Sequence, residues 1–365
     1  MNRPHKTILH VVGARPNYMK IAPLMDALKS VAGVRQILVN TGQHYDEAMA
    51  KGFIRELNLP MPDRDLEVGS ASHAVQTGNV MIRFEQVCLE ERPDLVVVVG
   101  DVNSTMAATL VAAKLLIPVA HVEAGLRSND RAMPEEINRI VTDRLADLLL
   151  TPSPDGNENL LREGVPAERV HLVGNIMIDT LFRHQPMATL DRVADRVNVK
   201  DGGYAVLTLH RPSNVDVLET FRILTAVAEI AAGLPVVFPV HPRTQARVKE
   251  FGLDALLKDV QTTGPLGYID FLSLTSHAKI VLTDSGGLQE ESTALGIPCL
   301  TLRENTERPV TVTHGTNTIV GTNTQRILAG YRAAMSGGVS KRRPELWDGQ
   351  TAGRIAAVLE RYLFG

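Results

Sequence analysis

Two carboxylates that could exchange protons with a substrate lie close together in the middle of the chain. Glu123 belongs to His121–Arg127 (HVEAGLR), and Glu135 belongs to Met133–Arg139 (MPEEINR). An arginine-bearing loop joins the two runs. General acid–base catalysis uses such carboxyl groups to remove a proton from one position and deliver one to another. This stretch therefore predicts a two-carboxylate site.

A strand and a helix must hold these two carboxylates. Pro118–Val122 is typical of a short buried strand that Gly125 ends, so Glu123 follows the strand's carboxyl end, where ligands of open α/β sheets bind. Pro134 suits the first position of a helix, because its missing N–H has no partner there. Glu135 falls in the first turn, where an acidic residue can also serve only to complement the helix dipole.

Apolar spacing predicts two helices, and for one of them the face that is buried. In the helix that carries Glu135, four residues recur at helical spacing and predict a face packed on a core: Ile137, Ile140, Val141 and Leu145. Ser70–Glu91 is predicted to be a long helix from the spacing of five residues: Val75, Val80, Ile82, Val87 and Leu89.

Two cations occur where the first strand, Thr7–Val12, gives way to a helix. The connecting stretch Gly13–Lys20 (GARPNYMK) lacks the G-x-G-x-x-G fingerprint of dinucleotide-binding proteins. It carries Arg15 and Lys20 in the opening turns of the predicted helix. Positive side chains are unfavourable near a helix N-terminus, so these two indicate an anionic ligand.

Further polar residues follow predicted strands in the first half. Asp94–Val99 is a nearly continuous apolar run, which is typical of a strand buried on both faces, and Asp101 follows it. Val34–Val39 ends at the polar loop Thr41–Asp46, which contains Gln43. The alternation of strands and helices predicts a doubly wound parallel sheet with these residues at one rim.

The same pattern restarts in the second half. The predicted strands are Tyr204–Leu209, Pro235–Val240, Ala278–Thr283 and Pro298–Leu302. His210 and His241 each follow one of them, beside an Arg or a Pro-Arg pair. A single histidine is more often structural, but two in such positions favour a functional role.

The turn Asp284–Glu291 (DSGGLQEE) predicts a diphosphate site. Two glycines let backbone N–H groups approach a ligand, and a helix N-terminus supplies positive potential. Glu291 could then accept hydrogen bonds from ribose hydroxyls. Alone, the glycines could serve only a tight turn. A nucleotide diphosphate is the better interpretation because cations follow neighbouring strands: Arg15, Arg211, Arg243 and Arg308.

Length and composition set the class of protein. At 365 residues the chain exceeds the size of a single core, and we expect domains at 1–176 and 177–345, with 346–365 a helix that packs back on the first. A net charge of −3 gives no general attraction to nucleic acid or to a membrane surface. Cys88 and Cys299 are isolated in apolar surroundings, which favours a reduced, cytoplasmic compartment. No metal-ligand spacing and no P-loop occurs, and no apolar run approaches the roughly 20 residues that span a bilayer.

Nine motifs, in order from Gly13 to Pro309, resemble the non-hydrolysing UDP-N-acetylglucosamine 2-epimerase family. They are GARPNYMKIAP, TGQHYD, GDVNST, HVEAGLRS, MPEEINR, LTLHR, HPRT, TDSGGLQEE and NTERP. The resemblance implies two Rossmann-like doubly wound α/β domains facing a cleft, the GT-B-like fold. It also implies a UDP-sugar substrate, no redox cofactor, a homodimer, and a product that supplies cell-envelope polysaccharide synthesis.

The resemblance also implies roles for residues that match the family's motifs. The catalytic residues would be Asp101, Glu123, Glu135 and His210. The residues that bind the substrate would be Arg15, Lys20, His241, Leu266, Phe271, Ser285, Gly286, Gly287, Glu291 and Arg308. Among these, Ser285 and the two glycines would hold the diphosphate, Glu291 the ribose, and Phe271 with the backbone near Leu266 the uracil.

The family's chemistry requires these residue types. Loss of UDP from C1 acidifies the C2 hydrogen, a carboxylate removes it to give a 2-acetamidoglucal, and UDP adds back with protonation on the other face. Which carboxylate serves which face stays open. So do four alternatives: a GT-B glycosyltransferase, a hydrolysing epimerase, a non-catalytic nucleotide-sugar sensor, and an epimerase for a modified UDP-sugar such as a diacetamido uronate. Gln43–Asp46 departs from many bacterial members, which leaves allosteric activation by substrate open.

Overall fold

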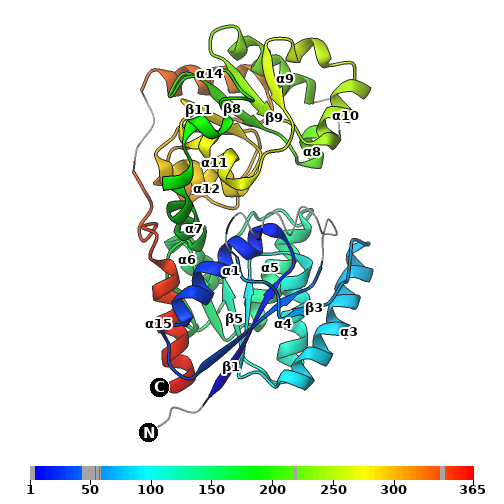
Figure 1. Cartoon of the computed structure of the whole chain (residues 1–365), viewed down its shortest axis with the longest axis vertical. Coiled ribbons are helices and arrows are strands. Elements are labelled where there is room, and N and C mark those ends of the chain that lie inside the picture. Colours follow the sequence, from blue (N-terminus) through cyan, green and yellow to red (C-terminus); the bar gives the residue numbers. More distant parts are fainter. Residues whose placement is uncertain (1–4, 43–53, 55–56, 58, 217–219, 338–341) are drawn as a thin grey trace. The chain divides into compact units, whose positions relative to one another are not determined.

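The structure is a computed structural model that describes residues 5–42, 54, 57, 59–216, 220–337 and 342–365 (Figure 1). The polar loop residues from Gln43 to Asp46 lie outside the described residues. Internal contacts divide the chain into two units. The first consists of Met1–Thr180 with Glu345–Gly365, and the second of Leu181–Pro344. Helix α7 (Ile176–His184) contains the boundary between them. Each unit is described by itself.

The first unit is built on a parallel sheet with the strand order β3-β2-β1-β4-β5-β6-β7. Its strands are β1 Lys6–Val12, β2 Val34–Asn40, β3 Arg64–Asp65, β4 Leu95–Val99, β5 Val119–Val122, β6 Leu148–Thr151 and β7 Val170–Leu172. Its helices are α1 Arg15–Leu28, α3 His73–Glu91, α4 Asn103–Lys114, α5 Pro134–Leu145, α6 Pro154–Arg162, η1 Ala167–Arg169 and α15 Thr351–Phe364. From β1, strands β2 and β3 extend the sheet toward one edge, whereas β4 and the strands after it extend it toward the other. Ligands of doubly wound sheets bind where the strand order reverses in this way.

Helices cover both faces of this sheet. Helices α3 and α4 pack on one face through a core that includes Phe84, Val87 and Ala108. Helices α1 and α15, from opposite ends of the chain, lie side by side (Figure 1). The carboxylate of Asp179 accepts hydrogen bonds from the backbone N–H groups of Thr351 and Ala352, at 3.1 and 2.7 Å, and so caps α15. This cap fixes the C-terminal helix to the first unit.

The second unit repeats the architecture, with the strand order β10-β9-β8-β11-β12-β13, again all parallel. Its strands are β8 Ala205–Thr208, β9 Val236–Pro239, β10 Val260–Thr263, β11 Ile280–Thr283, β12 Cys299–Thr301 and β13 Asn317–Ile319. Its helices are η2 Gln185–Met187, η3 Leu190–Val193, α8 Pro212–Val215, α9 Thr220–Ala231, α10 Pro242–Glu250, η4 Asp254–Leu257, α11 Tyr268–Ser276, α12 Gly286–Leu295, α13 Val310–Thr313 and α14 Thr324–Met335. Two doubly wound α/β units confirm the predicted fold class. No helix in the described ranges is long and apolar enough to cross a membrane.

The predicted buried face of α5 is wrong. In α5 the apolar residues Ile137, Ile140 and Leu145 are more than a third exposed. The residues that α5 buries are polar: Glu136, Asn138, Arg139, Thr142 and Asp143. The long helix predicted at Ser70–Glu91 is confirmed as α3. Of the five apolar residues that indicated it, two are buried, Val80 and Val87, and three are more than half exposed: Val75, Ile82 and Leu89. Helix α5 can bury polar groups because most of them bond to the loops that follow β4 and β5.

Candidate active site

Lys20 and Glu123 form a buried ion pair in the first unit. Lys20 lies in the second turn of α1, and Glu123 follows β5. Their side chains are only 9% and 3% exposed. Glu123 adopts a φ of +72°, in the left-handed region that residues other than glycine rarely occupy. Such strain persists only where the surroundings over-determine it and is concentrated at functional sites.

Asp101 follows Gly100, the residue after β4 whose backbone lies against Lys20. A Cβ atom built on Gly100 would lie 3.3 Å from the Lys20 Nζ. The Asp101 carboxylate pairs with Arg139 at 2.8 Å, and its backbone carbonyl accepts a hydrogen bond from the Asn138 amide at 2.9 Å. Helix α5 thus fixes both the side chain and the backbone of Asp101.

The two adjacent glutamates at the start of α5 have different surroundings. Glu136 is buried and accepts hydrogen bonds at 2.9 Å from the backbone N–H and hydroxyl of Ser128 and from the N–H of Asn129. Glu135 is exposed in the first turn. Glu136 therefore holds the loop that precedes α5, and of the two glutamates only Glu135 presents its carboxylate to solvent.

Arg15 is the first residue of α1 and is exposed. The turn before it is fixed by Asn17, whose side-chain oxygen accepts from the N–H groups of Gly13 and Ala14 at 3.1 and 2.9 Å. The Asn17 amide donates to the carbonyl of Val99 at 3.1 Å, which ties this turn to the end of β4. The first unit therefore places Arg15 at the same edge of the sheet as Asp101.

In the second unit, the predicted diphosphate turn joins β11 to the N-terminus of α12. Ser285 caps the helix and accepts a hydrogen bond from the N–H of Leu288 at 3.5 Å. A Cβ on Gly286 would lie 2.6 Å from the Glu307 Oε1 and 2.7 Å from the Arg308 Nη1. A Cβ on Gly287 would meet nothing within 4 Å. The helix start is therefore packed against protein at Gly286 and open at Gly287.

Arg308 lies against the start of α12, and two carboxylates neutralise its charge. It pairs with Glu290 at 2.8 Å and with Glu307 at 2.6 Å. Glu307 also pairs with Arg303 at 2.9 Å. Burial alone would raise the pKa of Glu307, but Arg308 and Arg303 hold that pKa well below its usual range. The guanidinium of Arg308 is thus held rigidly beside Gly286.

His210 is oriented by a carboxylate that the sequence interpretation did not select. Its Nδ1 lies 2.9 Å from the Oδ1 of Asp284, which is fully buried, while the His210 side chain is 55% exposed. Burial would raise the pKa of Asp284, but the hydrogen bond and charge of His210 and two backbone N–H groups keep it below its usual value. Because Nδ1 is engaged, proton transfer to a ligand would use the Nε2 of His210.

The remaining predicted binding residues lie on or next to helices α10, α11 and α12. Glu291 is buried, and the hydroxyl of Tyr268 donates to it at 3.2 Å. Burial raises the pKa of Glu291 to about 7, against the opposing hydrogen bond from Tyr268. Phe271 and Leu266 are partly buried against the core of the unit. His241 is exposed and caps α10, where its ring accepts from the N–H of Arg243 at 3.3 Å.

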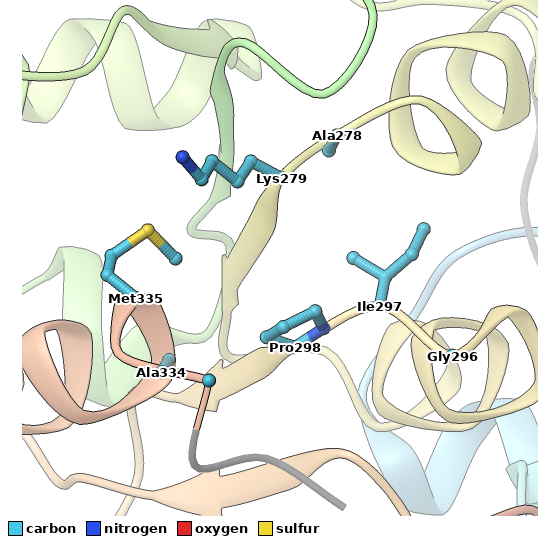
Figure 2. A pocket seen from close by; sticks show the side chains of 8 residues that line it. Ala278, Lys279, Gly296, Ile297, Pro298, Ala334 and Met335 are labelled. Carbon is cyan, nitrogen blue, oxygen red and sulfur yellow. The ribbon is translucent and has the colours of Figure 1, made fainter. Parts of the chain in front are cut away.

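A cavity of about 300 Å³ lies at the opposite edge of the second sheet (Figure 2). Lys279 and Pro298, which line it, precede β11 and β12, whereas Ser285 follows β11. Ile297 and Met335 also line this cavity. The cavity is therefore separate from the diphosphate turn.

The first unit thus carries carboxylates with fixed cationic partners, and the second carries an open helix N-terminus beside an arginine. Both sets follow the carboxyl ends of parallel strands. Two doubly wound units with polar residues after their strands are the architecture expected of the GT-B-like class.

Comparison with known proteins defines the family within this class. A family model described as UDP-N-acetylglucosamine 2-epimerase matches residues 26–360. The UDP-N-acetylglucosamine 2-epimerase of Methanocaldococcus jannaschii is 42% identical over 358 residues, covering 96% of this chain and 97% of the relative. The UDP-2,3-diacetamido-2,3-dideoxy-D-glucuronate 2-epimerase of Pseudomonas aeruginosa is 37% identical over 359 residues, covering 97% of this chain and 99% of the relative.

A solved structure agrees with these relatives. The crystal structure of the M. jannaschii UDP-GlcNAc 2-epimerase in complex with UDP-GlcNAc and UDP has a TM-score of 0.89 at 40% identity, with 97% of this chain and 99% of that chain covered. This chain belongs to the UDP-N-acetylglucosamine 2-epimerase family and is an epimerase, which confirms the resemblance seen in the motifs.

Proposed function

We propose that this enzyme reversibly interconverts UDP-N-acetylglucosamine and UDP-N-acetylmannosamine by inverting C2. Membership of the family supports the reaction, and the M. jannaschii relative was crystallised with UDP-GlcNAc and UDP. The observation that carries the proposal is the buried Lys20–Glu123 pair beside Asp101. It provides two ionisable carboxylates at the edge of the sheet where ligands bind.

The reaction proceeds by elimination and re-addition. The C1–O bond breaks and UDP departs with the bonding electrons, while a carboxylate takes the C2 proton. The electrons of that C–H bond form the C1=C2 double bond of 2-acetamidoglucal. UDP then adds back to C1 as a carboxylic acid protonates C2 from the other face. Asp101, Glu123 and Glu135 are the groups that exchange these protons, and no redox cofactor takes part.

The second unit holds UDP through both steps. Gly287 leaves the start of α12 open, so its N–H groups and those near Ser285 can bind a diphosphate. Arg308 lies beside that turn. With a proton on both ring nitrogens, His210 would donate from Nε2 to a phosphate oxygen as UDP leaves, because its Nδ1–H is directed at the Asp284 carboxylate.

Other side chains complete the proposed substrate site. Glu291 accepts from the ribose, and Phe271 with the backbone at Leu266 flanks the uracil. Arg15, Lys20 and His241 are the remaining proposed contacts.

A modified UDP-sugar is a second candidate substrate, because one relative is named for such a sugar. The P. aeruginosa protein that is 37% identical is named for UDP-2,3-diacetamido-2,3-dideoxy-D-glucuronate. That sugar differs from N-acetylglucosamine at C3 and C6, away from the C2 chemistry. The reaction type is therefore common to both candidates.

Proton NMR of the purified protein with each UDP-sugar tests the proposal. We expect the same equilibrium mixture of the two epimers from UDP-N-acetylglucosamine and from UDP-N-acetylmannosamine, with Asp101→Asn as the inactive control. Accumulation of free N-acetylmannosamine and UDP would instead establish a hydrolysing enzyme. Turnover of the diacetamido uronate alone would transfer the assignment to that substrate.

We also propose that the chain forms a homodimer through α3 and neighbouring helices. Val75, Ile82 and Leu89 recur every seventh residue of α3 and are 53%, 72% and 54% exposed. Ile137 and Ile140 of α5 are also exposed, and α4 contacts both helices. Such clustered apolar surface is typical of a protein interface.

Light scattering after size-exclusion chromatography tests this interface. Ile82→Asp with Leu89→Asp should convert a dimer to a monomer, whereas Leu161→Asp, at an exposed leucine of α6, should not. A dimer that survives the double substitution would refute the interface. A cytoplasmic location and a role in polysaccharide synthesis stay predictions from the sequence and the family.

A further inference from the structure

His121 is fully buried in β5, and both nitrogens of its ring face acceptors. Nδ1 lies 2.6 Å from the Oδ1 of Asp143, and Nε2 lies 2.8 Å from the backbone carbonyl of Gly100. A carbonyl oxygen can only accept a hydrogen bond, and so can an ionised carboxylate. A neutral imidazole has one N–H, so it can satisfy only one of these two contacts as a donor.

Asp143 is ionised, so the proton between it and His121 belongs to the ring. The other oxygen of Asp143 accepts from the Arg127 guanidinium at 2.6 Å and from the N–H of Gly125 at 3.1 Å. Burial would raise the pKa of Asp143, but His121 and Arg127 hold it below its usual value. Both nitrogens of His121 therefore carry a proton, and the ring is an imidazolium.

Arg127 also holds the next helix of the unit. It makes two hydrogen bonds of 2.8 Å to the carboxylate of Glu163, whose side chain is 41% exposed. Asp143 is therefore the buried carboxylate of this group, and its partners are the ring of His121 and the guanidinium of Arg127.

His10 provides the contrasting case within the same unit. It is also fully buried, but its only hydrogen bond within the described part of the chain joins Nε2 to the side chain of Gln36 at 3.0 Å. Burial lowers the pKa of His10 to about 4, so that ring is neutral. One buried histidine is thus neutral and the other is charged, and the difference lies in the acceptors around them.

The imidazolium touches the backbone that carries two of the proposed catalytic acids. Gly100 precedes Asp101, and its carbonyl is the Nε2 acceptor. Glu123 lies two residues beyond His121, at a strained φ of +72°. Lys20, the partner of Glu123, lies against Gly100. The charged groups on the elements around His121 therefore include Asp143 and Arg139 on α5, Arg127 and Glu123 after β5, Asp101 after β4, and Lys20 on α1.

We propose that His121 is a positioning residue whose two ring nitrogens both donate, one to Asp143 and one to the Gly100 carbonyl, and that it fixes the Gly100 turn so that Asp101 and Glu123 keep their catalytic geometry. This role rests on the proposed function, because it presupposes that these two acids do the chemistry. His121 itself touches no substrate.

NMR of protein labelled with ¹⁵N at histidine tests the charge without reference to activity. We expect His121, identified by the loss of its signals in His121→Gln, to show two N–H protons and the nitrogen shifts of an imidazolium. His10 should show a neutral ring. A single N–H on His121 would overturn the assignment.

Kinetics test the positioning role. His121→Leu and Asp143→Asn should lower kcat by about 10- to 100-fold with less than about threefold change in KM, because a small displacement of catalytic groups slows the chemical step. His121→Gln, whose amide can still donate to the Gly100 carbonyl, should recover part of kcat. His10→Gln should leave kcat unchanged.

The outcomes separate the two claims. Unchanged kcat in His121→Leu, or a change confined to KM, would refute the positioning role. Failure of the unmodified enzyme to epimerise any UDP-sugar would refute the proposed function, while the NMR result would still decide the charge of His121.

Discussion

The ammonium of Lys20 reaches the carboxylate of Glu123 across the end of an intervening strand. Lys20 follows β1 and Glu123 follows β5, and β4 lies between those strands in the sheet. Gly100 makes this possible, because it ends β4 at a φ of +68° and any side chain there would lie 3.3 Å from the lysine nitrogen. One buried ion pair thus spans the ends of three neighbouring strands, β1, β4 and β5.

Removing this lysine should cost both stability and activity. Lys20→Met leaves Glu123 buried without its cation, and we expect the free energy of unfolding to fall by about 3–5 kcal/mol, as it does when one member of a buried pair is lost. Urea denaturation measures this change. Lys29→Met is the matched control, because Lys29 pairs with Asp26 at the surface with side chains 73% and 46% exposed, and such a change should cost less than about 0.5 kcal/mol. Equal losses in the two variants would contradict the account.

The acids of the first unit should govern kcat and leave nucleotide binding intact. Asp101→Asn and Glu123→Gln should each lower kcat by about 10²- to 10⁴-fold, which is the usual contribution of a positioned acid or base. Calorimetry with UDP should show an affinity close to that of the unmodified enzyme, since the proposed UDP contacts other than Arg15 and Lys20 are in the second unit. Glu158→Gln, at an exposed position of α6, is the control. Full turnover in either variant would exclude that carboxylate from the chemistry.

The two glycines of the α12 turn should respond differently to the same change. Gly286→Ala places a methyl group against Glu307 and Arg308, and should destabilise the protein by about 1–3 kcal/mol, as overpacking usually does. Gly287→Ala meets nothing within 4 Å, and alanine favours a helix by up to about 1 kcal/mol. This variant should therefore keep or gain stability.

Calorimetric titration with UDP then shows whether a ligand uses the open side. If the diphosphate approaches Gly287, the alanine variant should bind UDP at least about tenfold more weakly, a loss of roughly 1.4 kcal/mol. Unchanged affinity in this stable variant would place the diphosphate elsewhere.

Glu291 should make stability depend on pH. Its pKa in the folded protein, about 7, is raised by burial above the ordinary value of 4.5. The folded state therefore binds the proton more tightly than the unfolded chain does. Raising the pH through this interval should reduce the free energy of unfolding by roughly 3 kcal/mol, since each pKa unit corresponds to about 1.4 kcal/mol. The loss is complete above about pH 7.

Glu291→Gln tests this dependence, because the amide cannot ionise. We expect unfolding free energies close to those of the unmodified protein near pH 5 and a higher value for the variant near pH 8. If ribose hydroxyls donate to the carboxylate, binding of UDP-N-acetylglucosamine should tighten between pH 6 and 8 in the unmodified protein alone. Parallel pH profiles for the two proteins would show that Glu291 does not titrate in this range.

The sequence predicted the strand ends of the site better than the partners that hold it. Apolar runs located β4 and β5, and therefore the edge where Asp101 and Glu123 lie. Nothing in the spacing indicated that Arg139 would bind Asp101 or that Asp284 would orient His210, because these contacts join segments far apart in the chain.

Helix α5 shows why periodicity misled. Its apolar residues, including Ile137, do share a face, and the usual inference places that face inside. The structure buries the other face instead, where Asp143 and Glu136 bond to the loops after β5. A hydrophobic pattern identifies two faces of a helix but cannot identify which one has hydrogen-bonding partners in the fold.

Incubation of the purified enzyme with UDP-N-acetylglucosamine in D₂O tests the central claim most directly. Proton removal and return at C2 should place deuterium at that carbon in both UDP-linked epimers, with little free sugar in a parallel UDP assay. Recovery of UDP-N-acetylglucosamine and UDP-N-acetylmannosamine without deuterium at C2 would contradict the account, because elimination and re-addition cannot occur without exchange of that proton.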